Sequence, residues 1–137
     1  MQWVWTYDEK IASRVQEGVD VIKTLIEHLE SSGWSAKQVF GVHMSMEEAV
    51  MNAIKHGNER DESKQVHVIM KTSEQTLYVK VTDQGEGFQP DHVPDCTTDE
   101  NLEKTSGRGL MLMKNYMDSV IYNAKGNSVE MTKSKDS

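Results

Sequence analysis

Residues 47–57 read Glu47-Glu48-Ala49-Val50-Met51-Asn52-Ala53-Ile54-Lys55-His56-Gly57 and combine a polar helical stripe with an apolar one. Glu48 and Asn52 are four residues apart and Lys55 follows three later, so on a helix they lie within about 60° of one another. A carboxylate and an amide oxygen on adjacent turns could hold Mg²⁺ or orient a nucleophile, while a lysine faces phosphate. The solvent-facing side of an ordinary helix has the same composition, so both interpretations stay open at this point.

This stripe belongs to a helix that is predicted to begin at Ser35, whose hydroxyl can cap free backbone N–H groups. Gly57-Asn58 is expected to supply the left-handed conformation that ends the helix. The core side of the helix is expected to carry the apolar residues at helical spacing, which are Val39, Val42, Met46, Ala49, Val50 and Ala53.

A strand and another helix are predicted before it. Gln2 to Tyr7 is aromatic and β-branched, and Asp8 with Lys10 then breaks the pattern, which indicates a short strand. A helix is expected from Ile11 to Ser31-Ser32-Gly33. Apolar residues at steps of three and four predict its core-facing stripe, which is Val15, Val19, Ile22, Ile26 and Leu29.

The second half of the sequence predicts two hairpins separated by a long loop and a third helix. Residues 65–72 and 76–83 alternate apolar and polar side chains, as antiparallel strands do. The third helix is expected from about Gly107, and residues 120–124 and 128–133 form a closing hairpin. Three helices on one face of a mostly antiparallel sheet make an α+β, two-layer sandwich. Methionines are expected to fill its core, including Met111, Met113 and Met117.

A second polar constellation is Asp83-Gln84-Gly85-Glu86-Gly87-Phe88, which puts a carboxylate where a strand leaves the sheet. Asp83 can accept a hydrogen bond from an exocyclic amine such as that of adenine. Gly85 and Gly87 leave room for a flat ring beside it. A tight turn is the alternative, because Asp and Gly are ordinary turn residues and Gly-x-Gly is weak by itself.

A third constellation is Ser106-Gly107-Arg108-Gly109-Leu110, which ends the long loop and opens the third helix. Unpaired backbone N–H groups and the positive end of the helix dipole can bind phosphate there. A serine cap with flanking glycines explains the same residues structurally. Loops as long as the one between Phe88 and Gly107 are typically functional.

In this order and at these spacings, the three segments resemble the N box and the two glycine boxes of the GHKL (histidine-kinase-like) ATPase superfamily. The likeness continues through residues 107–120 and is greatest to the bacterial anti-sigma-factor serine/threonine kinase branch. It covers nearly the whole chain, which implies one histidine-kinase-like ATPase domain, 1–137. A Bergerat-type ATP-binding fold is implied, with residues 89–106 as the ATP lid.

The resemblance also implies a role for each matching residue. Asn52 coordinates Mg²⁺, Glu48 acts as the base or orients the attacking group, and Asp83 binds adenine. Other residues are implied at the ring, the lid hinge and the phosphates, with Lys104 as a further lid candidate. These nucleotide-binding residues are Lys55, Gly85, Gly87, Gly107, Arg108, Gly109 and Leu110.

Composition excludes several other classes of protein. The chain has 137 residues, which fits one domain. Its 15 basic and 22 acidic side chains give a net charge of −7, which disfavours direct binding to nucleic acid. No apolar run approaches the roughly 20 residues that span a bilayer, and no targeting segment is recognisable, so a cytoplasmic protein without membrane contact is expected. Cys96 is the only cysteine, so the chain by itself builds neither a disulfide nor a thiolate zinc site.

The function that the resemblance implies is an anti-sigma regulatory factor. With ATP and Mg²⁺, it phosphorylates a serine or threonine of a small anti-anti-sigma (antagonist) protein, and it also binds a sigma factor. Two alternatives stay open, a nucleotide-gated binding module without transfer and a stand-alone histidine-kinase-type ATPase domain. A sensor histidine kinase also needs a helical dimerisation domain, for which 137 residues leave no room. A homodimer is one arrangement that the sequence leaves open.

Overall fold

The structure is a computed structural model that describes residues 2–85 and 105–135. Most of the expected ATP lid, residues 89–104, lies outside the described residues. The elements in chain order are β1 (Trp5–Ala12), α1 (Val15–Ser31), α2 (Ala36–Asn52), η1 (Ala53–Gly57), β2 (Gln65–Thr72), β3 (Thr76–Thr82), α4 (Thr105–Tyr116), β4 (Ser119–Tyr122) and β5 (Ser128–Ser134).

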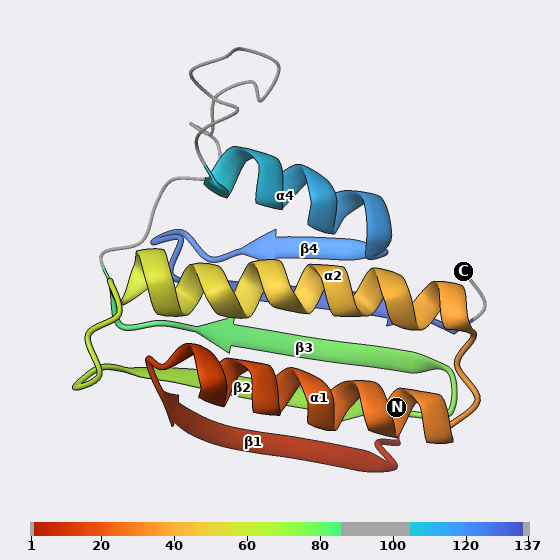
Figure 1. Ribbon diagram of the computed structural model, residues 1–137. Helices are drawn as coiled ribbons and strands as arrows, with labels where there is room; N and C mark the ends of the chain where they lie inside the picture. Colours follow the sequence, from red (N-terminus) through yellow and green to blue (C-terminus); the bar gives the residue numbers. More distant parts are fainter. Residues whose placement is uncertain (1, 86–104, 136–137) are drawn as a thin grey trace.

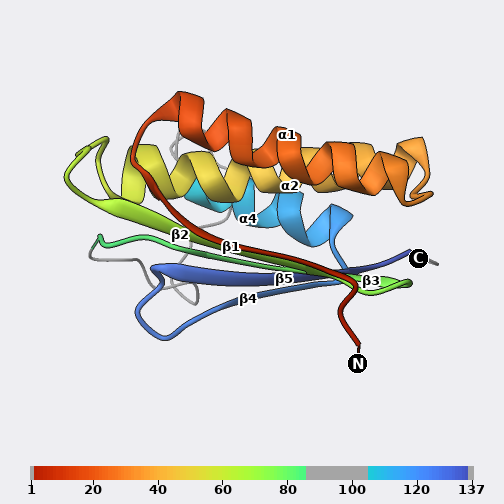
Figure 2. The same cartoon turned by 90° about the horizontal axis from the view of Figure 1, so that it is seen from below.

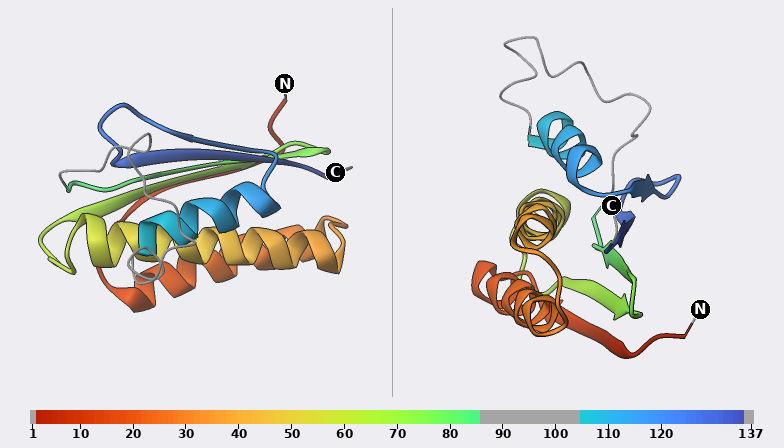
Figure 3. Two further views of the ribbon diagram at one scale, coloured as in Figure 1. Left: turned by 90° about the horizontal axis from the view of Figure 1, so that it is seen from above. Right: turned by 90° about the vertical axis from the view of Figure 1, so that its right-hand side faces the viewer.

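The five strands form one sheet in the order β1-β2-β3-β5-β4, and every neighbouring pair is antiparallel. The helices α1, α2 and α4 lie side by side on one face of this sheet (Figures 1 and 2). Figure 3 shows the two layers from the end, with all three of the described helices on the same side of the sheet. The predicted α+β two-layer sandwich is therefore confirmed. Among the described residues, no helix is long and apolar enough to cross a membrane.

The core-facing stripe of α1 differs from the prediction. Val15 and Val19 are 40% and 43% exposed. Ile11, from which the helical spacing was counted, lies in β1, and the helix begins only at Val15. Gly18 belongs to the buried stripe because α1 packs closely against the end of α2 and the start of η1. A Cβ on Gly18 would lie 2.9 Å from Ile54 Cδ1. The buried stripe is Gly18, Val21, Ile22, Leu25 and Leu29.

The first strand also differs, since it does not end at Tyr7 but continues through Asp8 and Lys10 to Ala12. β1 is an edge strand and pairs only with β2. Its charged side chains stay exposed there, and Asp8 forms a hydrogen bond with His67 on the neighbouring strand. Charges therefore do not interrupt a strand that has solvent on one side.

The start and the core face of α2 are confirmed. The Ser35 Oγ accepts a hydrogen bond from the Gln38 N–H at 3.2 Å, and the Ser35 N–H donates to Gln38 Oε1 at 3.1 Å. This reciprocal pair is a capping box. Every residue predicted for the core side is buried, namely Val39, Val42, Met46, Ala49, Val50 and Ala53.

The predicted end of this helix is wrong. Asn58 has a φ of −91°, and the positive φ angles fall on Glu59 (52°) and Arg60 (59°). After Asn52 the chain widens into the π-helix η1, and the Asn58 N–H donates to the Ala53 carbonyl at 2.8 Å. Asn58 is buried and held by its side chain, so the reversal of the chain falls on the two exposed residues that follow.

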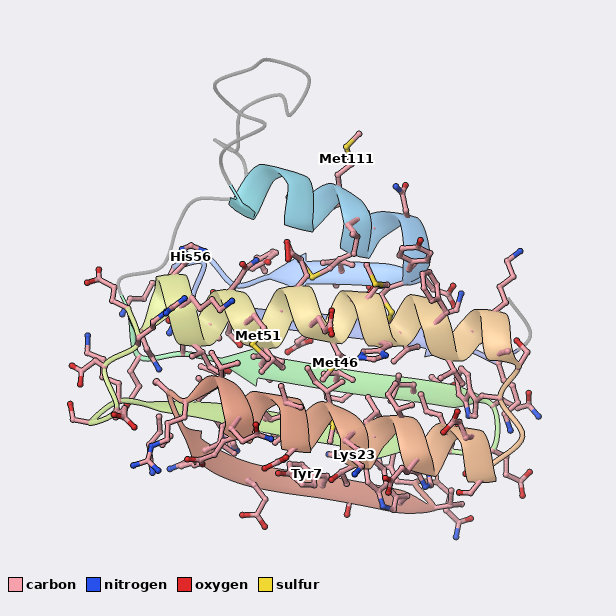
Figure 4. The ribbon with its side chains drawn as sticks, viewed as in Figure 1. Tyr7, Lys23, Met46, Met51, His56 and Met111 are labelled. Atoms are coloured by element: carbon pink, nitrogen blue, oxygen red, sulfur yellow. The ribbon has the colours of Figure 1, made fainter. Side chains whose placement is uncertain are left out.

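Several of the described methionines are buried in the core, namely Met46, Met70, Met113, Met117 and Met131. Met113 is fully buried and Met117 nearly so, as expected. Met111 is 51% exposed, which contradicts the prediction, and Figure 4 shows it pointing away from the sheet on the outer side of α4. The helix turns its 110/113/117 side towards the core, so Met111 falls on the opposite side.

Candidate functional site

Asp83 stands directly after β3, and its backbone is fixed to the turn between β4 and β5. The Asp83 N–H donates to the Asn127 carbonyl at 2.9 Å, and the Asn127 Nδ2 donates to the Asp83 carbonyl at 2.9 Å. The Gly85 N–H donates to the Asp83 Oδ1 at 2.8 Å. Hydrogen bonds with Asn127 therefore fix the Asp83 backbone, and the hydrogen bond from Gly85 fixes one oxygen of its carboxylate.

Gly57, at the end of η1, provides the surface on which this carboxylate lies. A Cβ on Gly57 would lie 2.3 Å from Asp83 Oδ2 and 2.4 Å from its Cγ, so no side chain fits there. A Cβ on Gly85 would lie 1.9 Å from the Gly57 carbonyl oxygen. The π-helix brings this backbone against Asp83, and π-helical turns are frequent at functional sites. Gly57 was predicted only as part of the helix end, and its contact with Asp83 was not predicted.

Asn58 is a second residue that the sequence analysis missed in this role. Its Nδ2 donates to Ser13 Oγ at 2.9 Å and to the Gln65 carbonyl at 3.0 Å. Its Oδ1 accepts from the Gln84 N–H at 2.7 Å. One buried amide therefore ties β1, β2 and the turn after Asp83 to the end of η1. No sequence signal distinguishes this asparagine from one in a surface turn.

The charges around the site shift two pKa values. Burial raises the pKa of Asp83, although the hydrogen bond from Gly85 and the charges of Lys125 and Lys64 act in the opposite direction. Burial also raises the pKa of the Tyr122 hydroxyl, and the negative charges of Glu48 and Asp83 raise it further. Tyr122 lies at the end of β4 and packs against the core. Its hydroxyl therefore stays protonated between the two acidic regions of the site.

Glu48 contacts the N-terminal part of α4. A Cβ on Gly109 would lie 2.6 Å from Glu48 Oε1 and 2.8 Å from its Cδ. Asn52 follows one turn later on the same helix, so the two side chains share a face of α2 as expected. Lys55 lies in η1, where the wider winding departs from the α-helical stripe assumed for all three.

The other predicted phosphate-binding residues lie at the start of α4. The helix begins at Thr105, before the predicted start at Gly107, so the last residues of the expected lid belong to the helix. The backbone of Gly107 and Arg108 lies in its first turn, Gly109 and Leu110 lie in its second turn, and Leu110 is half-buried. The N–H groups of a first turn have no partners within the helix and can bind an anion. Gly87 and Lys104 lie outside the described residues.

The donor atoms suit magnesium held jointly with phosphate. Within residues 2–85 and 105–135, no group of three or more His, Cys, Asp or Glu could hold a metal ion. The Asn52 amide oxygen is an uncharged oxygen donor one turn from Glu48 on α2. Mg²⁺ typically keeps several waters and takes one or two protein oxygens together with substrate phosphates, so this set fits it.

Comparisons with known proteins identify the family of this chain. A model of the histidine kinase-like ATPase domain matches residues 11–133. The chain is 30% identical over 127 residues to the serine-protein kinase RsbW of Bacillus subtilis, which covers 85% of this chain and 78% of the relative. It is 38% identical over 92 residues to the anti-sigma F factor of Anoxybacillus flavithermus, which covers 63% of this chain and 62% of that relative's length.

A solved structure shows the same fold. The crystal structure of the RsbU and RsbW domains of a Mycobacterium tuberculosis protein superposes with a TM-score of 0.65 at 14% identity. The superposition covers 96% of this chain and 32% of that chain. The chain therefore belongs to the histidine kinase-like ATPase domain family, in the branch that contains anti-sigma factors and the serine-protein kinase RsbW.

Proposed function

We propose that this protein is an anti-sigma regulatory factor that transfers the γ-phosphoryl group of MgATP to a serine or threonine of a small anti-anti-sigma protein. The observation that carries the proposal is the contact between Glu48 and Gly109 of α4. It puts an acceptor carboxylate, with Asn52 one turn away, beside a helix end suited to phosphate. The relatives named anti-sigma F factor and serine-protein kinase RsbW support the same function.

The nucleotide base is proposed to bind at Asp83. The Asp83 Oδ1 accepts from Gly85, so Oδ2 is the oxygen suited to the exocyclic amine of adenine. Gly85 is proposed to lie beside the ring, where its missing side chain also accommodates the Gly57 carbonyl oxygen. The bare backbone of Gly57 keeps the carboxylate in place, because any side chain there would displace it.

The phosphates are proposed to bind between α2 and the start of α4. Gly107 offers a backbone N–H group in the first turn of α4, Gly109 and Leu110 adjoin it in the second turn, and Arg108 and Lys55 offer positive charge. When bound, Mg²⁺ neutralises charge on the phosphates. The Asn52 amide oxygen is its proposed protein ligand, with phosphate oxygens and water completing the coordination.

The proposed reaction requires mainly that the protein position the reacting groups. Phosphoryl transfer passes through a loose transition state, so catalysis rests on alignment and charge neutralisation. The role proposed for Glu48 is to accept the hydrogen bond of the incoming serine or threonine hydroxyl and then its proton. The proposed division of labour is that Asp83 holds the base, Asn52 the metal ion and Glu48 the attacking group.

The proposed partners are a sigma factor and its antagonist. Sigma factors present basic DNA-contacting surfaces, and the net charge of −7 on this chain is complementary to them. Phosphorylation adds charge to the antagonist and alters the interface that it presents, which is how the modification controls the exchange of partners.

The test is to incubate the full chain with MgATP and candidate antagonists encoded beside it. Stable phosphoserine or phosphothreonine, located by mass spectrometry, is the expected product. Glu48→Gln serves as the control, since it keeps the size of the side chain. Capture of an antagonist with nucleotide but without phosphate transfer would establish a binding module instead. Absence of calorimetric heat with both MgATP and MgADP would refute the nucleotide site itself.

A further inference from the structure

The helices α2 and α4 approach each other at two glycines. A Cβ on Gly41 of α2 would lie 2.9 Å from Tyr116 Cδ1. A Cβ on Gly109 of α4 would lie 2.6 Å from Glu48 Oε1. Each contact thus joins a glycine on one helix to a large side chain on the other.

The two contacts belong to a single antiparallel register. Gly41 and Glu48 are about two turns apart on α2, and Gly109 and Tyr116 are the same distance apart on α4. The two helices run side by side in opposite directions (Figures 1 and 3). One contact therefore cannot shift along the helices without the other.

The Glu48 contact involves most of that side chain. The three nearest atoms to a Cβ on Gly109 are Glu48 Oε1, Cγ and Cδ, at 2.6, 2.7 and 2.8 Å. Real Cβ atoms do not approach this closely, so a side chain at 109 displaces either the carboxyl group or the helix. Gly109 itself is buried. The Glu48 side chain consequently lies along the α4 backbone.

We infer that Gly109 is a positioning residue for Glu48. Its missing side chain lets the Glu48 carboxyl group lie against α4, which fixes the acceptor beside the phosphate-binding end of that helix. The inference rests on the proposed function. It differs from phosphate binding through a backbone N–H, because a backbone N–H is available from alanine as well as from glycine.

Two accounts of Gly109 make opposite predictions. If the residue serves only phosphate, alanine obstructs the nucleotide whatever stands at position 48. If it seats Glu48, alanine collides with that side chain, and Glu48→Ala removes all three colliding atoms. Alanine is also favoured over glycine inside a helix. The effect of Gly109→Ala on stability is then expected to change sign. The substitution should destabilise the chain that carries Glu48 and stabilise the chain that carries Glu48→Ala.

The experiment is a thermal double-mutant cycle on the full chain without nucleotide. Gly109→Ala is expected to lower Tm by about 3 to 8 °C in the wild-type background. In the Glu48→Ala background it is expected to leave Tm unchanged or raise it by a few degrees. If Gly109→Ala does not fold, recovery of folding in the double variant gives the same answer.

Kinetics separate positioning from structure. Gly109→Ala is expected to lower kcat for transfer to the antagonist by roughly 10- to 100-fold, because misplacement of a reacting group is costly. The KM for ATP is expected to stay within about threefold of wild type. Gly41→Ala is the matched control. It is expected to lower Tm equally in both Glu48 backgrounds, because its added methyl group meets Tyr116 and not Glu48.

Equal Tm losses for Gly109→Ala in both backgrounds would overturn the inference. So would a raised KM with an unchanged kcat, which is the result expected from obstructed phosphate. Failure of the proposed function looks different, since the wild-type chain then phosphorylates no antagonist. The Tm cycle uses neither nucleotide nor antagonist, and it still decides whether Gly109 seats Glu48.

Discussion

Two carboxylates of the site each lie on a glycine, but they are supported in different ways. Asp83 lies on Gly57 and is fixed by hydrogen bonds from Gly85 and from the turn at Asn127. Glu48 lies on Gly109, so its position depends on how α4 packs on α2. One support is the hydrogen-bonded end of a sheet and the other is a contact between two helices.

This difference separates the region proposed for nucleotide recognition from the region proposed for phosphoryl transfer. The Asp83 region keeps its geometry as long as the sheet is folded. The Glu48 region changes whenever α4 moves relative to α2, and α4 follows directly after the residues expected to form the lid. Substitutions near Asp83 should therefore act on nucleotide affinity, and substitutions near Glu48 on the rate of transfer.

The largest effect is expected from Glu48→Gln. Glutamine keeps the size of the side chain but removes the negative acceptor, so phosphoryl transfer should fall by roughly 10² to 10⁴. Calorimetry should show nucleotide and partner binding near wild type. Single-turnover transfer to the antagonist measures the rate. A normal rate in this variant would remove Glu48 from the mechanism and leave transfer to positioning alone.

Asn52→Ala should not separate the two effects, because a ligand of the metal ion contributes both to nucleotide binding and to phosphoryl transfer. Affinity for MgATP and turnover are both expected to fall by roughly 10- to 100-fold. Titration with and without Mg²⁺ is the measurement, and metal-free nucleotide serves as the control. Wild-type metal dependence in the variant would assign Mg²⁺ to other ligands.

Asp83→Asn should act on recognition alone. Loss of a hydrogen bond to a charged group costs about 1.5 to 3 kcal/mol, so nucleotide affinity should fall about ten- to a hundredfold. Transfer at saturating nucleotide should stay close to wild type. Calorimetry with MgADP checks the first expectation and a saturated assay the second. An unchanged affinity would place the base elsewhere.

Gly57→Ala tests whether the support of Asp83 matters as much as its charge. The added methyl group would lie 2.3 Å from Asp83 Oδ2, so the carboxylate has to move. Nucleotide affinity is expected to fall about tenfold. In the double variant with Asp83→Asn, the loss of nucleotide-binding free energy should be less than the sum of the losses in the two single variants, because both substitutions act on one interaction. Fully additive losses would mean that Gly57 acts independently of Asp83.

The smallest effect concerns stability against pH. Burial raises the pKa of Asp83 in the folded chain above its ordinary value of 3.8. The folded state therefore binds this proton more tightly than the unfolded state, so the group's contribution to stability falls as pH rises between the two pKa values. Asp83→Asn should accordingly gain Tm relative to wild type from acidic to neutral pH, without nucleotide. A difference in Tm that does not vary with pH would contradict this.

The features of the fold that could be predicted from the sequence depend on residues that are close together along the chain. Ser35 and Gln38 form their capping box within one turn, and Val42 and Met46 follow from helical spacing alone. The alternation in residues 65–72 likewise fixes which side chains of β2 face the core. Glu48 and Asn52 share one face of α2 for the same local reason.

The features that could not be predicted from the sequence depend on contacts between residues that are far apart along the chain. Gly57 matters because of Asp83, and Asn58 is buried because Ser13 and Gln84 supply its hydrogen-bond partners. The buried stripe of α1 follows from where η1 approaches Gly18, which spacing within α1 does not reveal. Such contacts form only when the sheet brings the segments together.

The charged edge of the sheet has a consequence for how this protein behaves at high concentration. β1 leaves one row of backbone N–H and C=O groups without a neighbouring strand, which is a template for adding the strand of another chain. Asp8, Glu9 and Lys10 stand in succession on that strand, and a strand added alongside would have to accommodate their charges and hydration. At the opposite edge, β4 is only four residues long. Both edge strands of the described sheet therefore disfavour the addition of a further strand, which growth into a fibril would require.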